Sequence, residues 1–171
     1  IYSTQLSGNT RLDLMKIVFA VYAEVPGVLN WPKDEKGKIS FKLDRLTPKN
    51  GVNHENAHDA LGDVEATLFL FKKIRERAPE FFQKLFRARD KNYIAGEIKA
   101  FKPMAVTLRF GNQPPKTYQG CFCGENLTNK NQIGFLDFNL NHVNELKYAD
   151  KKMVEDAVSS SPKKIRSLAI N

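Results

Sequence analysis

Cysteine is scarce in this sequence. Only Cys121 and Cys123 occur, one residue apart, and a disulfide between such near neighbours would be strained. Neither a second cysteine pair nor a nearby histidine accompanies them, so the spacing of a zinc site is missing. We therefore expect two buried or half-buried free thiols in a reducing compartment.

Long apolar runs are missing as well. Residues 1–5 have neither a basic start nor a long apolar run, so they predict neither a signal peptide nor a membrane anchor. An initiator methionine is also lacking. We expect the chain to begin inside a longer protein or to have been trimmed, and we expect no membrane partner.

The sequence does contain enough apolar material for a core, together with an excess of positive charge. Of its 171 residues, 42% are hydrophobic and 11% aromatic, which suffices for one ordinary domain or two small ones. Lys and Arg outnumber Asp and Glu 27 to 19, which gives a net charge of +8. A basic balance favours a polyanionic partner such as nucleic acid, although many basic proteins have none.

The first part of the chain has helical spacing. Residues 11–24 place apolar side chains three or four positions apart, and Pro26-Gly27 ends the run. The apolar residues Phe41, Leu43 and Leu46 predict either a short helix or an extended segment.

Residues 56–78 carry the strongest helix pattern of the sequence. Asn56 is a candidate N-cap, and Pro79 closes the run. Four apolar residues line one face of this helix: Leu61, Val64, Leu68 and Phe71. Residues 80–89 predict a second, short helix with packed phenylalanines.

After about Gly96 the spacing changes to short runs typical of strands. Turn residues separate three such runs, at 104–110, 119–123 and 133–140. The change predicts a domain boundary between Pro79 and Gly96. We divide the chain into residues 1–85 and 86–171, and expect an antiparallel, β-rich second domain.

His58 and Asp63 are the first candidates for chemistry. On a regular helix they are about 140° apart, so they share one site only if His58 lies at the first turn. Asp63 suits Mg²⁺ or Mn²⁺, which prefer oxygen ligands, and a neutral His58 suits proton removal from metal-bound water. On spacing alone, a capping or packing histidine is the more common explanation.

A resemblance adds weight to this pair. His58-Asp59-Ala60, Asp63 and Ala66-Thr67 reproduce the third motif of the DEDDh exonucleases, His-x-Ala-x-x-Asp. Five segments are similar to the bacterial exonuclease I family: 9–14, 30–32, 40–43, 46–47 and 56–60. The resemblance is strong to about Phe86 and weaker beyond it.

The resemblance implies an α/β plus β fold. Residues 1–85 would form the C-terminal helical part of a ribonuclease-H-like exonuclease domain, and residues 86–171 an incomplete SH3-like, β-rich domain. The family's first motif, Asp-x-Glu on an early strand, and its second Asp are expected upstream of the point that corresponds to Ile1. The family's C-terminal helical domain is expected to be missing.

The resemblance also implies a function, 3′→5′ hydrolysis of single-stranded DNA in repair and recombination by a monomeric enzyme of the bacterial cytoplasm. Mg²⁺ or Mn²⁺ would be the cofactor in a two-metal-ion mechanism, with His58 as the general base and Asp63 as a metal ligand. Lys42 falls where the family carries a basic residue that contacts the DNA backbone, although a solvated lysine fits equally well.

Two partners are implied, single-stranded DNA and the acidic tail of a single-stranded-DNA-binding protein. Because the other carboxylates are expected upstream, this chain alone should be inactive.

Other interpretations stay open. His54-Glu55-x-x-His58 fits the zinc metalloprotease pattern, although the turn at 49–53 places His54 before the helix. A non-catalytic module that binds single-stranded nucleic acid or protein is another alternative. Basic residues with interleaved aromatics between Lys72 and Lys91 predict a surface for DNA or an acidic tail, or else a solvated helix face.

Overall fold

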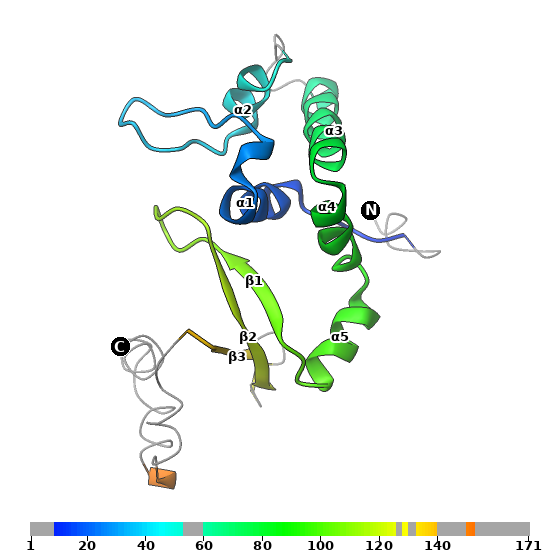
Figure 1. Ribbon diagram of the computed structural model, residues 1–171, viewed down its shortest axis with the longest axis vertical. Helices are drawn as coiled ribbons and strands as arrows, with labels where there is room; N and C mark the ends of the chain where they lie inside the picture. The colour runs from blue at the N-terminus through cyan, green and yellow to red at the C-terminus, as the bar shows by residue number, and fades with distance from the viewer. Residues whose placement is uncertain (1–8, 53–59, 126–127, 130–132, 140–149, 153–171) are drawn as a thin grey trace. The chain divides into compact units, whose positions relative to one another are not determined.

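The computed structural model describes residues 9–52, 60–125, 128–129, 133–139 and 150–152 (Figure 1). The chain divides into two compact units. The first contains the residues up to Glu97 together with the segment Thr107–Thr117, and the second contains Ile98–Val106 and the residues from Tyr118 onward.

Helix α1 spans Leu14–Glu24 and confirms the helix predicted over residues 11–24. Asp13 caps its N-terminus, because the carboxylate accepts a hydrogen bond of 2.9 Å from the backbone N–H of Met15. Its apolar face is buried at Ile17, Val18 and Val21. A short 3₁₀ helix, η2 (Pro26–Val28), follows directly.

The segment that the sequence left undecided is a helix, α2 (Leu43–Lys49). Leu46 is almost completely buried. The hydroxyl of Thr47 donates a hydrogen bond of 2.6 Å to the carbonyl oxygen of Leu43, so this polar side chain is satisfied inside the core. Pro48 fits in the last turn.

Helix α3 (Ala60–Arg77) confirms the strongest predicted helix, but its buried face differs from the apolar face noted in the sequence. Ala66, Leu70 and Ile74 are buried, and α3 packs through them against α1, α2 and α4. The exposed fractions of Leu61, Val64 and Leu68 are 65%, 54% and 51%. The helix therefore has two apolar faces, and the described neighbours cover only one of them.

Helix α4 (Pro79–Arg87) begins at the proline that ends α3, which confirms the predicted second short helix. Phe82 is buried, with its ring centroid 4.8 Å from that of Phe71 and 5.6 Å from that of Phe86. These aromatic contacts join α4 to α3.

Helix α5 (Lys91–Lys99) was not predicted. None of its residues is buried, and its nine residues are too few to show a clear apolar stripe in the sequence. Within the described ranges, every helix is too short or too polar to span a bilayer.

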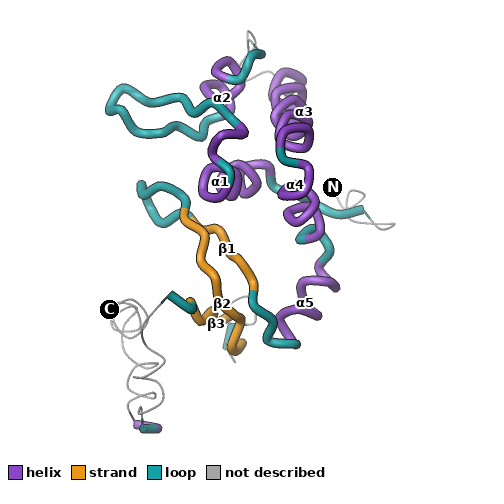
Figure 2. Tube along the Cα trace, viewed as in Figure 1, coloured by secondary structure: helices purple, strands orange, loops and turns teal. Residues whose placement is uncertain are grey.

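Three strands form one sheet in the order β1 (Met104–Leu108), β2 (Lys116–Glu125) and β3 (Ile133–Asp137) (Figure 2). They correspond to the three predicted strand runs. Strands β2 and β3 are antiparallel, as expected. Gly120 is required here, because a Cβ at this position would lie 1.9 Å from the carbonyl oxygen of Leu136.

Both cysteines are free thiols on β2. Cys121 is half-buried, as expected, whereas the expectation of burial was wrong for Cys123, which is exposed. A register shift between Phe122 and Gly124 removes Cys123 from the regular pairing. The side chain lies beside Gly134, which has no side chain to cover the thiol.

Candidate active site

The motif that carries the predicted chemistry is only partly within the described residues. Residues 53–59 lie outside them, and with these His58, the candidate N-cap Asn56 and the His54-Glu55 half of the zinc pattern. Their predicted roles stay predictions. The residues on either side of the segment are described, and they define where it begins and ends.

Asp63 lies in the first turn of α3 and is exposed. A helix N-terminus presents partially positive N–H groups, which favour an anionic substrate nearby. The one Asp-x-Glu of the whole sequence, Asp63-Val64-Glu65, is also here. Because it lies in a helix, it is not the strand-borne first motif of the DEDDh family.

A buried amide fixes the backbone that leads into residues 53–59, the motif segment. Asn50 is 3% exposed. Its side-chain oxygen accepts a hydrogen bond of 2.9 Å from the N–H of Asn30, and its side-chain nitrogen donates to the carbonyl oxygens of Asn30 and Leu46 at 2.9 and 2.8 Å. The side chain thus ties the end of α2 to the loop after η2.

A second contact joins this turn to α3. The ammonium of Lys73 donates a hydrogen bond to the carbonyl oxygen of Asn50. On the same turn, the N–H of Val52 donates to the carbonyl oxygen of Thr47 at 3.3 Å. Residue 52, before the motif segment, and α3, which follows it, are therefore held on one scaffold. Sequence reasoning missed this network, because its contacts to Asn30 and Lys73 join Asn50 to residues 20 and 23 positions away.

Lys42, the predicted DNA contact, is the N-cap residue of α2 and is exposed. Its carbonyl oxygen accepts hydrogen bonds from the N–H groups of Arg45 and Leu46 at 3.2 and 2.9 Å. The backbone of Lys42 is therefore fixed while its ammonium is accessible to solvent. Both the DNA contact and the solvated lysine are compatible with this position.

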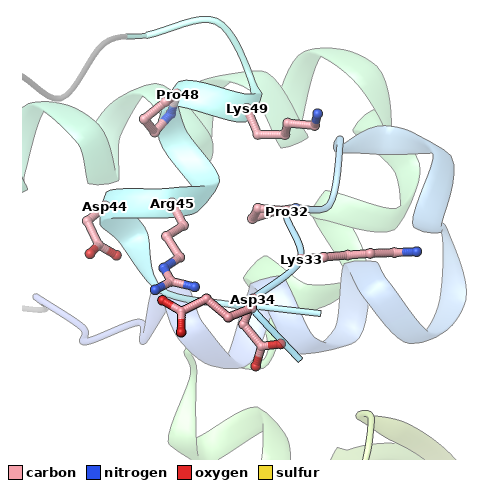
Figure 3. A pocket seen from close by; sticks show the side chains of 8 residues that line it. Pro32, Lys33, Asp34, Asp44, Arg45, Pro48 and Lys49 are labelled. Atoms are coloured by element: carbon pink, nitrogen blue, oxygen red, sulfur yellow. The ribbon is translucent and has the colours of Figure 1, made fainter. Parts of the chain in front are cut away.

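Beside α2 lies an open hollow of about 700 Å³ that the sequence did not indicate (Figure 3). Arg45 points to the side on which Asp34 lies. Cations and carboxylates are equally numerous in its lining, which consists of Pro32, Lys33, Asp34, Glu35, Asp44, Arg45, Pro48 and Lys49. Such a balanced lining has no net attraction for a polyanion.

Two more of the basic residues between Lys72 and Lys91 make contacts within the fold. Arg77 donates a hydrogen bond of 3.2 Å to the carbonyl oxygen of Val28. The guanidinium of Arg89 lies 3.7 Å from the ring centroid of Phe86, at cation–π distance. These contacts favour the solvated helix face over a dedicated binding surface for these two residues.

The described residues do not complete a metal site. No group of three or more His, Cys, Asp or Glu side chains with suitable geometry occurs among them. Mg²⁺ and Mn²⁺ need several oxygen ligands, and a two-metal site needs several carboxylates. Asp63 is a carboxylate of the kind that such a site uses, but one carboxylate alone does not make the site.

Comparison with known proteins supports the resemblance read from the sequence. No protein-family model matches the chain. The exodeoxyribonuclease I of Haemophilus influenzae is 47% identical over 88 residues, which cover 52% of this chain and 19% of that protein. The Escherichia coli exodeoxyribonuclease I is 40% identical over 106 residues, 60% of this chain and 22% of that protein. The chain thus spans about a fifth of the length of these curated relatives.

Solved structures of exonuclease I are also similar to this chain. E. coli exonuclease I in complex with a dA16 oligonucleotide matches with a TM-score of 0.66 and 30% identity, over 91% of this chain and 34% of that one. A complex of exonuclease I with the SSB C-terminus matches with a TM-score of 0.64 at 28% identity, over 90% of this chain and 34% of that one.

A zinc-bound E. coli exonuclease I–single-stranded DNA complex matches with a TM-score of 0.65 at 29% identity, over 91% of this chain and 34% of that one. The resemblance is therefore confirmed: over about 60% of its length this chain is homologous to exodeoxyribonuclease I.

Proposed function

We propose that this chain is part of a 3′→5′ exodeoxyribonuclease that degrades single-stranded DNA. The observation that carries the proposal is the third DEDDh motif, His58 to Asp63, in a sequence 40% identical to E. coli exodeoxyribonuclease I over 106 residues. The oligonucleotide in a matching E. coli complex supports single-stranded DNA as the ligand.

In this proposal His58 is the general base and Asp63 is one ligand of Mg²⁺ or Mn²⁺. The metal would activate water and stabilise the charge that develops on the phosphate. Asp63 is suited to this by its exposed position at the start of α3, where the helix N-terminus also favours an anionic strand. His58 would accept the proton from the attacking water.

Lys42 would contact the DNA backbone. A lysine supplies a point charge without the paired hydrogen bonds of an arginine, so we expect little selectivity for the geometry of the phosphate. Its fixed backbone at the start of α2 supports this role.

The proposal extends to fold and biology. Residues 1–85 would belong to a ribonuclease-H-like exonuclease domain and residues 86–171 to an SH3-like domain. The protein would act as a monomer in the bacterial cytoplasm during DNA repair and recombination. The acidic tail of a single-stranded-DNA-binding protein would be its protein partner, which the SSB C-terminus in a matching complex supports.

One observation favours a second candidate, a non-catalytic module that binds single-stranded nucleic acid. Within the described part of the chain, Asp63 is not accompanied by the further ligands of a metal cluster. If no other carboxylates join it, the chain would keep its net charge of +8, which favours a polyanion, without the chemistry.

Digestion of a 3′-labelled oligonucleotide in Mg²⁺ separates the two candidates. We expect no digestion by the isolated chain. We expect processive digestion by a hybrid E. coli exodeoxyribonuclease I in which this chain replaces the aligned segment. A folded hybrid that binds the oligonucleotide without cutting it in Mg²⁺ or Mn²⁺ would favour the non-catalytic module, and robust digestion by the isolated chain would contradict the need for further carboxylates.

A further inference from the structure

A second hollow, of about 600 Å³, lies between the loop that precedes α2 and the turn between β1 and β2. Both segments belong to the first compact unit. Its polar lining residues are Asp34, Lys36, Lys38, Arg109, Asn112 and Gln113. None of these belongs to the third DEDDh motif, and Lys42 is not among them.

Arg109 is held in this hollow by aromatic rings of the core. Its guanidinium carbon lies 5.0 Å from the ring centroid of Phe41 and 5.5 Å from that of Phe19, at cation–π distance. Phe19 and Phe41 are buried and meet edge to face at 5.1 Å. The position of the guanidinium is therefore set by rigid neighbours.

The hydrogen bonding of Arg109 leaves most of its donors accessible. Its Nε donates to the carbonyl oxygen of Gln113 at 3.2 Å. Within the part of the chain that the structure describes, its two terminal nitrogens donate to no other residue. A guanidinium fixed in this way presents a planar set of donors that matches the geometry of a phosphate.

The charges of the hollow favour an anion. Lys36, Lys38 and Arg109 face a single carboxylate, that of Asp34, so the lining carries a net charge of +2. The Oδ1 atom of Asp34 accepts hydrogen bonds of 2.9 Å from the N–H groups of both Lys36 and Lys38. This carboxylate is therefore occupied in shaping the loop that presents the two ammonium groups.

We propose that this hollow binds a phosphodiester group of single-stranded nucleic acid. Arg109 supplies paired hydrogen bonds to the phosphate oxygens, and Lys36 and Lys38 supply charge. The inference rests on the proposed function, which supplies the ligand, and adds to it a backbone contact at a distinct place. The hollow of Figure 3 lacks this property, because its charges balance.

Binding of a fluorescein-labelled oligo(dT) to the full chain, followed by anisotropy over a range of salt concentrations, tests the proposal. Each lost phosphate contact should reduce the salt slope by about 0.7, which corresponds to roughly fivefold weaker binding at 0.1 M salt. Arg109→Gln and the double substitution Lys36→Gln with Lys38→Gln should each show such a loss. Arg109→Lys should lose less, because it keeps the charge.

Lys33→Gln is the matched control. Lys33 is exposed on the same loop, but it lines the other hollow. The affinity of this variant for oligo(dT) should therefore stay within twofold of that of the unmodified chain. Equal losses in the control and in the hollow variants, or no loss in either, would overturn the proposal. Unchanged thermal unfolding checks that each variant is folded.

Two further arms separate this proposal from its neighbours. If a poly-glutamate peptide binds through the same residues while oligo(dT) does not, the hollow accepts an acidic protein, and the nucleic-acid proposal is overturned. The hybrid nuclease distinguishes failure of the site from failure of the function. Full digestion together with unaffected hollow variants would overturn only the phosphate site, and absence of digestion would overturn only the proposed activity.

Discussion

The side chain of Asn50 forms a reciprocal pair of hydrogen bonds with the backbone of Asn30. It accepts from the N–H of Asn30 and donates to its carbonyl oxygen, both at 2.9 Å. A single buried amide thus replaces the pairing that a neighbouring strand would provide, at the turn that leads into the motif segment.

Asn50→Asp should destabilise the fold strongly. The substitution replaces the side-chain N–H₂ with an oxygen, so the carbonyls of Asn30 and Leu46 each lose a donor. At about 1–3 kcal/mol for each unsatisfied group, the free energy of unfolding should fall by about 2–6 kcal/mol in urea denaturation. Asn92→Asp, at an exposed position in α5, is the control and should change little. Equal stability of the two variants would contradict the structural role of Asn50.

Lys73→Met tests the contact between α3 and the turn. The substitution keeps most of the apolar stem and removes the hydrogen bond to the carbonyl oxygen of Asn50. We expect the free energy of unfolding to fall by roughly 1 kcal/mol. Lys72→Met, one position earlier on an exposed part of the helix, should be nearly neutral. If the two variants are equally stable, Lys73 does not join these elements in solution.

Leu70→Ala and Leu68→Ala form a matched pair on α3. Leu70 is fully buried, so its truncation should cost about 2–5 kcal/mol. Leu68 is 51% exposed, and its truncation should cost much less. Urea denaturation measures both. A large loss for Leu68→Ala would show that the second apolar face of α3 is covered in solution.

Periodicity in the sequence predicted α1, α3 and α4 well, because an apolar stripe is a local property of the chain. It did not identify the buried face of α3, since Leu61, Val64 and Leu68 are as apolar as the residues that are buried. Which face is covered depends on distant partners. Periodicity did not indicate α5 and left α2 undecided, because nine and seven residues are too few to show a clear apolar stripe.

The candidate site was predicted by motif, and its surroundings were not. His58 and Asp63 were candidates from their chemistry and gained weight from a resemblance that the comparisons confirm, and Lys42 came from that resemblance alone. Their individual roles stay predictions. The Asn50 network and the cationic hollow at Arg109 join residues 20 or more positions apart. No local pattern in the sequence predicts such contacts, because they form only when the chain folds.

The most direct test of the proposed function compares two variants of the hybrid nuclease, His58→Ala and His54→Ala. The measured quantity is the rate at which each releases nucleotides from a 3′-labelled single strand in Mg²⁺. With His58 as the general base, His58→Ala should slow release by about 100-fold or more while oligonucleotide binding is retained. His54→Ala, four positions earlier in the same segment, should keep nearly full activity. Full activity of a folded His58→Ala hybrid would contradict the role of His58 as the general base.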